Sequence, residues 1–146
     1  MEISNYLPKW GWEKSVDDFL KYWFESEDKI HQSLVEEIHK LRKQGIKCYL
    51  ATNQEKYRTE YILRNMGFEN IFDGIFSSAQ VGHMKHTNEY YRHILSQLTD
   101  IKLNEILLWD DDMKNIGKAK QIGLHAEFYT SFEDFQKKME QYFTTE

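Results

Sequence analysis

The feature that most constrains this chain is the alternation of short apolar runs with longer amphipathic segments. Residues 46–51 form a short, nearly continuous apolar run, as expected for a strand covered on both faces. Similar short runs occur at residues 75–76, 106–109 and 124–129, and segments with helical periodicity separate them. This order predicts right-handed crossovers between parallel strands. We therefore expect an α/β fold, a Rossmann-like three-layer sandwich with a parallel sheet of about four strands.

The amphipathic segments carry helix-end signals. Ser15 and Asp18 have the spacing of a reciprocal N-terminal cap, and Gly45, Gly67 and Gly123 stand where helices are expected to end. The predicted helices span residues 15–27, 33–44, 54–66 and 87–98, a segment that ends at Gly123, and a last segment that begins at a Ser131 cap.

Composition excludes several classes of protein. The 146 residues carry 19 Lys and Arg against 24 Asp and Glu, a net charge of −5. A mildly acidic chain without a basic cluster is unsuited to nucleic acid or to anionic membranes. No apolar stretch approaches the roughly 20 residues of a membrane span. The single cysteine, Cys48, indicates a reducing compartment. We expect a soluble, cytoplasmic protein that binds neither nucleic acid nor membranes.

Polar side chains follow the first two predicted strands. Thr52 and Asn53 end the first strand just before a helix, where a hydroxyl can meet an anionic oxygen such as phosphate. Lys85 lies on a glycine-containing loop after the second strand and can supply a positive charge to the same anion. Taken singly, Thr52 is better interpreted as a helix cap and Lys85 as a solvated lysine.

An acidic run follows the third predicted strand. Asp110, Asp111 and Asp112 are consecutive, and a bound cation relieves the cost of ionising neighbouring carboxylates. Mg²⁺ prefers one or two carboxylates together with water and phosphate oxygens. Aspartates are also common in the first turn of a helix, which explains Asp111 and Asp112 more easily than Asp110. Because ligands bind at the carboxyl ends of parallel strands, we expect the hydroxyl, ammonium and carboxylates to converge.

This order of motifs resembles the haloacid dehalogenase superfamily of phosphatases and related hydrolases. KCYLATNQ resembles the family's second motif, VGHMKHTNEYYRHIL its third, and LLWDDDMKNIGKAKQIGLHAEFY its fourth. The resemblance covers residues 33–130, and the fourth motif, with Asn115, Ala119 and Gly123 in register, is its most specific part.

The resemblance implies roles for five residues. Thr52 would hydrogen-bond the phosphoryl oxygens, and Asn53 would help to shape that pocket. Lys85 would neutralise the nucleophile and the phosphate. Asp111 would bind Mg²⁺ directly, and Asp110 would hold a metal-bound water. The implied reaction is Mg²⁺-dependent hydrolysis of a small phosphate monoester.

Two departures from the family pattern affect that expectation. His86 replaces the proline that usually follows the lysine. The family's first motif, a strand ending in Asp-x-Asp that supplies the nucleophile, has no match before Trp10. Aspartyl phosphoryl transfer requires a carboxylate in line with phosphorus. We therefore expect the chain to be inactive by itself as a phosphatase; the alternative is a non-catalytic binding or interaction module of the same fold.

The missing strand also bears on the architecture. Residues 1–32, with three tryptophans, resemble the remnant of a helical cap, and residues 33–146 the family core without its first strand. In the family that strand lies between the strands expected at 46–52 and 105–110. These two strands could pair directly, residues 1–7 or a second molecule could fill the place, or the chain could be part of a longer or split protein. We favour direct pairing or a homodimer contact.

Overall fold

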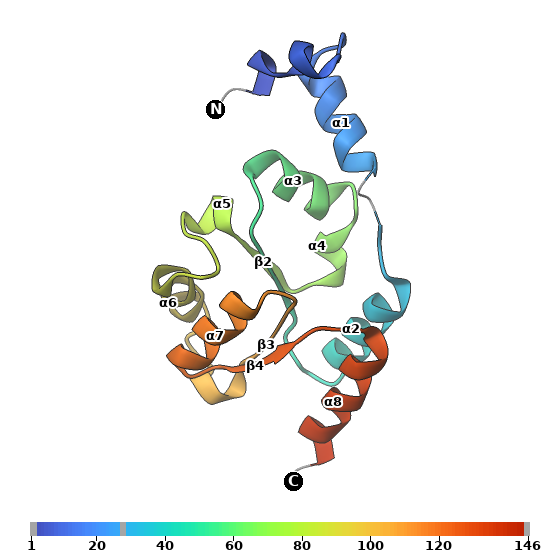
Figure 1. The fold of residues 1–146 in the computed structure, drawn as a ribbon. Helices are drawn as coiled ribbons and strands as arrows, with labels where there is room; N and C mark the ends of the chain where they lie inside the picture. The colour runs from blue at the N-terminus through green and yellow to red at the C-terminus, as the bar shows by residue number, and fades with distance from the viewer. Residues whose placement is uncertain (1–2, 27–28, 145–146) are drawn as a thin grey trace.

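The computed structural model describes residues 3–26 and 29–144. Within them, four strands lie between two helical layers (Figure 1). The strands are β1 (Tyr49–Thr52), β2 (Gly74–Ser77), β3 (Leu107–Asp110) and β4 (His125–Phe128). The α-helices are α1 (Val16–Ser26), α2 (Gln32–Lys43), α3 (Lys56–Arg64), α4 (Phe68–Ile71), α5 (Ser78–Val81), α6 (Asn88–Gln97), α7 (Met113–Ile122) and α8 (Phe132–Thr144). Short 3₁₀ helices are η1 (Ile3–Asn5), η2 (Leu7–Trp10) and η3 (Leu103–Glu105).

Two apolar clusters define the layers. On one face of the strands, α6 and α7 pack around Tyr90, Tyr91 and Ile116, and this cluster receives side chains from all four strands. On the other face, α2 and α8 pack against Leu107 and Trp109. Figure 1 shows these two pairs of helices on opposite sides of the strands. The α/β three-layer prediction is confirmed.

The strands form two separate parallel pairs. β1 pairs with β2, and β3 pairs with β4. The expectation that the strands at 46–52 and 105–110 pair directly is therefore wrong. β1 and β3 each pair with the strand that follows them in the chain, after a helical crossover. The ammonium of Lys85 lies between the carboxyl ends of β1 and β3. Among the described residues, no strand fills the space between the two pairs.

Local capping explains where the helices begin. The hydroxyl of Ser15 accepts a hydrogen bond from the backbone N–H of Asp18, as the spacing predicts. The predicted end of that helix, residue 27, lies outside the described residues. The interpretation of Thr52 as a helix cap is wrong, because the carboxylate of Glu55 caps α3 instead. The Ser131 hydroxyl caps α8, as expected.

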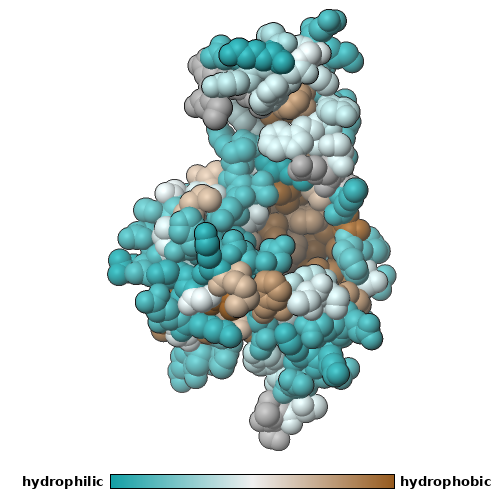
Figure 2. All heavy atoms as spheres, viewed as in Figure 1, coloured by the Kyte–Doolittle hydropathy of each residue, from teal (hydrophilic) through white to brown (hydrophobic). Residues whose placement is uncertain are grey.

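The N-terminal segment is a cluster of aromatic side chains, and it contacts the rest of the fold through α3. Phe24 of α1 lies against Tyr61, with ring centroids 5.3 Å apart. The guanidinium of Arg58 donates to the carbonyl of Phe24 at 3.1 Å. Figure 2 shows hydrophobic residues gathered near the middle of the visible face, below this segment. The assignment of residues 1–32 as a cap remnant stays a prediction.

Asp73 fixes the beginning of the first strand pair. Its carboxylate accepts the backbone N–H of Cys48 at 2.8 Å and the guanidinium of Arg42 at 3.0 Å. Burial alone would raise the pKa of this carboxyl, but the hydrogen bonds from Cys48 and Arg42, with the charges of Arg42 and Lys47, hold the pKa below its ordinary value. The ionised form is therefore the one that stabilises the fold.

We predict that Asp73→Asn reduces the loss of stability in acid. Because the folded-state pKa is lowered, the stabilisation by Asp73 is complete above the ordinary pKa of an aspartate. It is lost as the pH falls through the folded value. The measurement is urea unfolding of wild type and variant from about pH 6 to about pH 2.5. Parallel pH profiles for the two proteins would contradict this role.

No helix in the described parts of the chain combines the length and the apolar character that crossing a bilayer requires.

Candidate active site

An ion pair lies at the carboxyl ends of both strand pairs. The ammonium of Lys85 is 2.6 Å from Oδ2 of Asp110 and 3.4 Å from the carbonyl oxygen of Ala51. The side chains are 13% exposed for Lys85 and 3% for Asp110. A lysine ammonium has three N–H donors, so one remains for a ligand. Lys85 thus joins the end of β1 to the end of β3 and keeps a donor for an anion.

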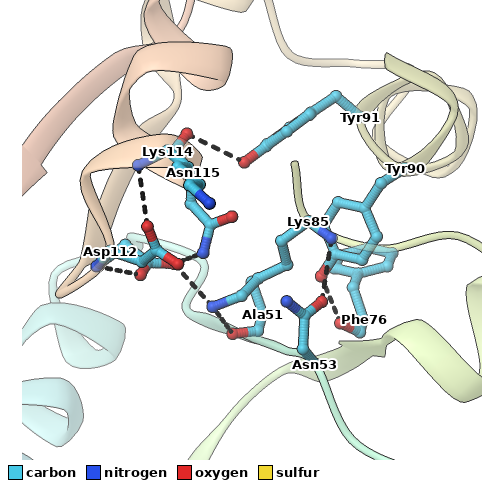
Figure 3. Close-up of polar contacts among 10 residues, drawn as sticks. Ala51, Asn53, Phe76, Lys85, Tyr90, Tyr91, Asp112, Lys114 and Asn115 are labelled. Atoms are coloured by element: carbon cyan, nitrogen blue, oxygen red, sulfur yellow. Dashed lines mark hydrogen bonds and ion pairs between the residues drawn. The ribbon is translucent and has the colours of Figure 1, made fainter. Parts of the chain in front are cut away.

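Asn53 positions the loop that carries Lys85. Its side-chain oxygen accepts the backbone N–H of Lys85 at 2.9 Å (Figure 3). The loop follows α5 and leads into α6, whose N-terminus is capped by the hydroxyl of Thr87. The side chain just after β1 therefore fixes where the lysine enters the site.

Two groups besides Lys85 hold the carboxylate of Asp110. Its Oδ1 accepts the backbone N–H of Asp112 at 2.9 Å, and its Oδ2 accepts Nδ2 of Asn115 at 3.2 Å as well as Lys85. Burial would raise the pKa of Asp110, but these hydrogen bonds and the charge of Lys85 outweigh it and lower the pKa. Asp110 is therefore ionised at neutral pH.

Two buried tyrosines of α6 lie beside the site. Tyr90 donates its hydroxyl to the carbonyl of Phe76, and Tyr91 donates to the carbonyl of Asn115 at 3.4 Å. Burial, reinforced by the negative charge of Asp110, raises the pKa of Tyr91 to about 12. Burial also raises the pKa of Tyr90. Both phenols stay neutral and act as hydrogen-bond donors.

Of the hydroxyl, ammonium and carboxylates expected to converge, the structure brings together Lys85 and Asp110. Asn53, which was expected to shape the same pocket, contacts the backbone of Lys85. The functional roles of these residues stay predictions. Thr52 ends β1 opposite Ser77 in the ladder, and its hydroxyl makes none of the hydrogen bonds described above. Asp111 is exposed and lies outside this hydrogen-bonded cluster. Asp112 caps α7 by accepting the backbone N–H of Lys114 at 2.9 Å, as expected for an aspartate at a helix start.

The side chains at the site could supply only some of the ligands that a metal ion needs. Among the described residues, no three His, Cys, Asp or Glu side chains gather in a metal-binding group. Asp110 and Asp111 are two adjacent carboxylates at the end of β3. Such a pair fits Mg²⁺, which keeps several waters and takes phosphate oxygens as further ligands, but does not form a complete protein cage.

An open hollow adjoins the cluster on the side of β1 and α5. Its volume is about 520 Å³, and Asn53, Glu55, Ser78 and Met84 are among the residues that line it. This space, beside the loop of Lys85, is large enough for a small ligand.

Sequence reasoning assigned no role to Asn115 or to the two tyrosines. Asn115 lies five residues after Asp110, where the first turn of α7 returns its amide to the carboxylate. Its position in the fourth motif could have indicated this contact. The partners of Tyr90 and Tyr91 are main-chain carbonyls of distant segments, and no local pattern predicts them.

Comparisons with known proteins agree with the geometry. A family model for haloacid dehalogenase-like hydrolases matches residues 12–123. A sesquiterpene phosphatase from Aspergillus oryzae is 35% identical over 88 residues, which are 60% of this chain and 44% of that protein. A drimenol cyclase from Aspergillus calidoustus is 22% identical over 95 residues, 65% of this chain and 18% of that protein. The chain spans less than half the length of these relatives.

Solved structures show the same fold. A HAD-like family hydrolase from Porphyromonas gingivalis superposes with a TM-score of 0.78 and 16% identity, covering 98% of this chain and 72% of that one. A Bacillus subtilis protein described as a HAD-hydrolase, bound to magnesium, gives a TM-score of 0.64 and 20% identity, covering 85% and 56%. With its strand-end cluster and its match over residues 12–123, this chain belongs to the haloacid dehalogenase-like hydrolases.

Proposed function

We propose that this chain supplies the phosphate- and magnesium-binding part of a phosphatase site that hydrolyses phosphate monoesters. The observation that carries the proposal is the ammonium of Lys85, shared between Asp110 and the end of β1 with one donor left for an anion. The match to a sesquiterpene phosphatase supports a phosphorylated organic molecule as the substrate class. The substrate's organic part would occupy the hollow beside Asn53.

Each residue of the site has a separate role in this proposal. Lys85 binds and neutralises the phosphoryl group, and Asn53 orients the loop that carries it. Asp110, ionised because of its hydrogen bonds and its lysine partner, and the exposed Asp111 would hold Mg²⁺. When bound, the metal would supply charge stabilisation to the phosphate oxygens. Thr52 would contact the same oxygens.

The nucleophile is the part that these residues do not supply. Among the described residues before Lys85, neither strand ends in a carboxylate, since β1 ends in Thr52 and β2 in Ser77. An in-line carboxylate is required for aspartyl phosphoryl transfer. The 146-residue chain is therefore expected to bind phosphate without turnover.

The test is calorimetric titration with inorganic phosphate, with and without MgCl₂. We expect binding that requires Mg²⁺ and that weakens by about tenfold or more in Asp111→Asn. Asp111 is exposed, so this variant is expected to fold normally. Asp100→Asn, which removes another exposed carboxylate outside the site, is the matched control and should bind as wild type.

Two results would overturn the proposal. Absence of phosphate binding at millimolar concentration in the presence of Mg²⁺ would favour a non-catalytic module. Hydrolysis of p-nitrophenyl phosphate by the purified chain would show that a nucleophile is present, provided that Asp111→Asn abolishes it and so excludes a contaminating enzyme.

A further inference from the structure

Another hollow lies at the opposite end of β1 from the candidate active site. Its volume is about 710 Å³, within the usual range for small-molecule sites. The charged and titratable residues that line it are His39, Arg42, Lys43, Lys47 and Asp73. We call it the basic hollow, because its three cations and one carboxylate give a net charge of +2 with a neutral histidine, whereas the whole chain carries −5.

Three segments of the chain meet at the basic hollow. His39, Arg42 and Lys43 lie on α2 at positions i, i+3 and i+4, so they share one face of that helix. Lys47 lies between α2 and β1, and Asp73 lies just before β2. The hollow is therefore built where α2 packs against the start of the β1–β2 pair, and its charged groups come from both.

The guanidinium of Arg42 is held in a fixed position at the basic hollow. Its Nη1 donates to the carbonyls of Asn70 and Ile71 at 3.1 and 2.9 Å. Its Nη2 donates to Oδ1 of Asp73 at 3.0 Å. These contacts use three of the five N–H groups of the guanidinium, and the side chain remains 30% exposed. Arg42 therefore offers an anion a preorganised cation with further N–H donors.

The two negative features of the basic hollow are already compensated. The carboxylate of Asp73 accepts hydrogen bonds from Cys48 and Arg42. It also lies 3.8 Å from the ammonium of Lys47, and its side chain is only 14% exposed. The last carbonyls of α2, at the negative end of the helix dipole, accept N–H groups of residues 44–46. The exposed ammonium of Lys43 adds positive charge that neither feature cancels.

We propose that the basic hollow binds a phosphate anion with two or more negative charges, such as a diphosphate group. Arg42 would form charge-assisted hydrogen bonds with its oxygens, which the planar guanidinium matches in geometry. Lys43 and Lys47 would add two point charges, and His39 a ring N–H from the same side of α2. A hollow lined mainly by one sign of charge strengthens the attraction for such an ion. This site is separate from the one near Lys85, because all of β1 lies between them.

The probe is pyrophosphate, added without Mg²⁺ to the isotopically labelled full chain. We expect saturable binding at millimolar concentration or below, with shifts of the backbone amide NMR signals of residues 43–47 and of Asp73. ADP, which carries the same group on an organic molecule, is the second probe. Tighter binding of ADP at these amides indicates a ligand with an organic part, and tighter binding of pyrophosphate indicates a free anion.

A double variant of the chain tests which cations bind the ion. Lys43→Gln with Lys47→Gln removes two exposed ammonium groups from the basic hollow and leaves Arg42 with its contacts in place. The side chain of Lys47 is 64% exposed, so its ion pair with Asp73 contributes little to folding. We expect a folded variant that binds pyrophosphate about tenfold or more weakly.

The matched control is Lys120→Gln with Lys137→Gln, which removes the same charge from exposed positions on α7 and α8 and should bind pyrophosphate as wild type does. Three results would overturn the proposal: no binding at millimolar pyrophosphate, amide shifts only near Lys85, or equal weakening in both double variants, which would show that net charge alone attracts the ion. Because no step uses Mg²⁺ or the residues near Lys85, these failures are distinct from a failure of the proposed function.

Discussion

Replacing Tyr90 by alanine lowers the free energy of unfolding by about 3–5 kcal/mol, the usual cost of deleting a buried aromatic ring. Tyr90 is 0% exposed and lies in the cluster that joins both strand pairs to α6 and α7. Its ring contacts Tyr91 edge-on, with centroids 5.4 Å apart. Truncation therefore opens a cavity at the junction of the two pairs. The measurement is urea unfolding at neutral pH.

Tyr90→Phe separates the ring from its hydroxyl. The variant keeps the packing but leaves the carbonyl of Phe76 without the tyrosine donor. We expect a loss of about 1 kcal/mol, the net value of one hydrogen bond. A loss in Tyr90→Ala no greater than that in Tyr90→Phe would show that the ring is not part of a tightly packed core.

Lys85→Met is the second change with a large expected effect, a destabilisation of about 3–5 kcal/mol at neutral pH. The substitution keeps the length of the side chain but leaves the carboxylate of Asp110, which is 3% exposed, without its cation. Burial then dominates and raises the pKa of Asp110. Protonation relieves the unpaired charge, so the deficit relative to wild type should shrink as the pH falls. Urea unfolding at several pH values measures both effects.

The matched control is the double variant Lys85→Met with Asp110→Asn. Removing both charges leaves no buried ion, and the amide can still accept the N–H of Asp112. We expect the double variant to be more stable than Lys85→Met alone. If the two effects simply add, Lys85 and Asp110 are not coupled, and the ion pair is not the element that joins β1 to β3.

The order of helices and strands could be predicted from local pattern alone. The apolar run before Asp110 and the helical stripe containing Leu41 lie in the expected elements. The starts of helices were harder to predict: α3 begins at Lys56 with Glu55 as its cap, not at the end of β1. A carboxylate and a hydroxyl can cap equally well, and the path of the chain after β1 decides which one reaches the free N–H groups.

The sequence predicts those parts of the site that lie directly after the strands. Lys85 and Asp110 meet because the carboxyl ends of parallel strands share an edge. Asp110 is buried, whereas Asp111 is exposed. The difference arises at the start of α7, where the amide of Asn115 and the backbone N–H of Asp112 both bind the carboxylate of Asp110. Because Asp110 and Asp111 are identical neighbours, the sequence does not predict which of the two carboxylates is buried.

Hydrophobic periodicity and the order of polar residues after each apolar run are local properties. The sequence alone therefore predicts the α/β class and the polar residues at the strand ends. Whether β1 and β3 touch is a different kind of question. Pairing between distant segments depends on the helices packed on both faces and on Lys85 between the strand ends. Only the folded arrangement could show that the four strands of the described residues form two separate pairs, because hydrogen bonds between strands are made in space and leave no periodicity in the sequence.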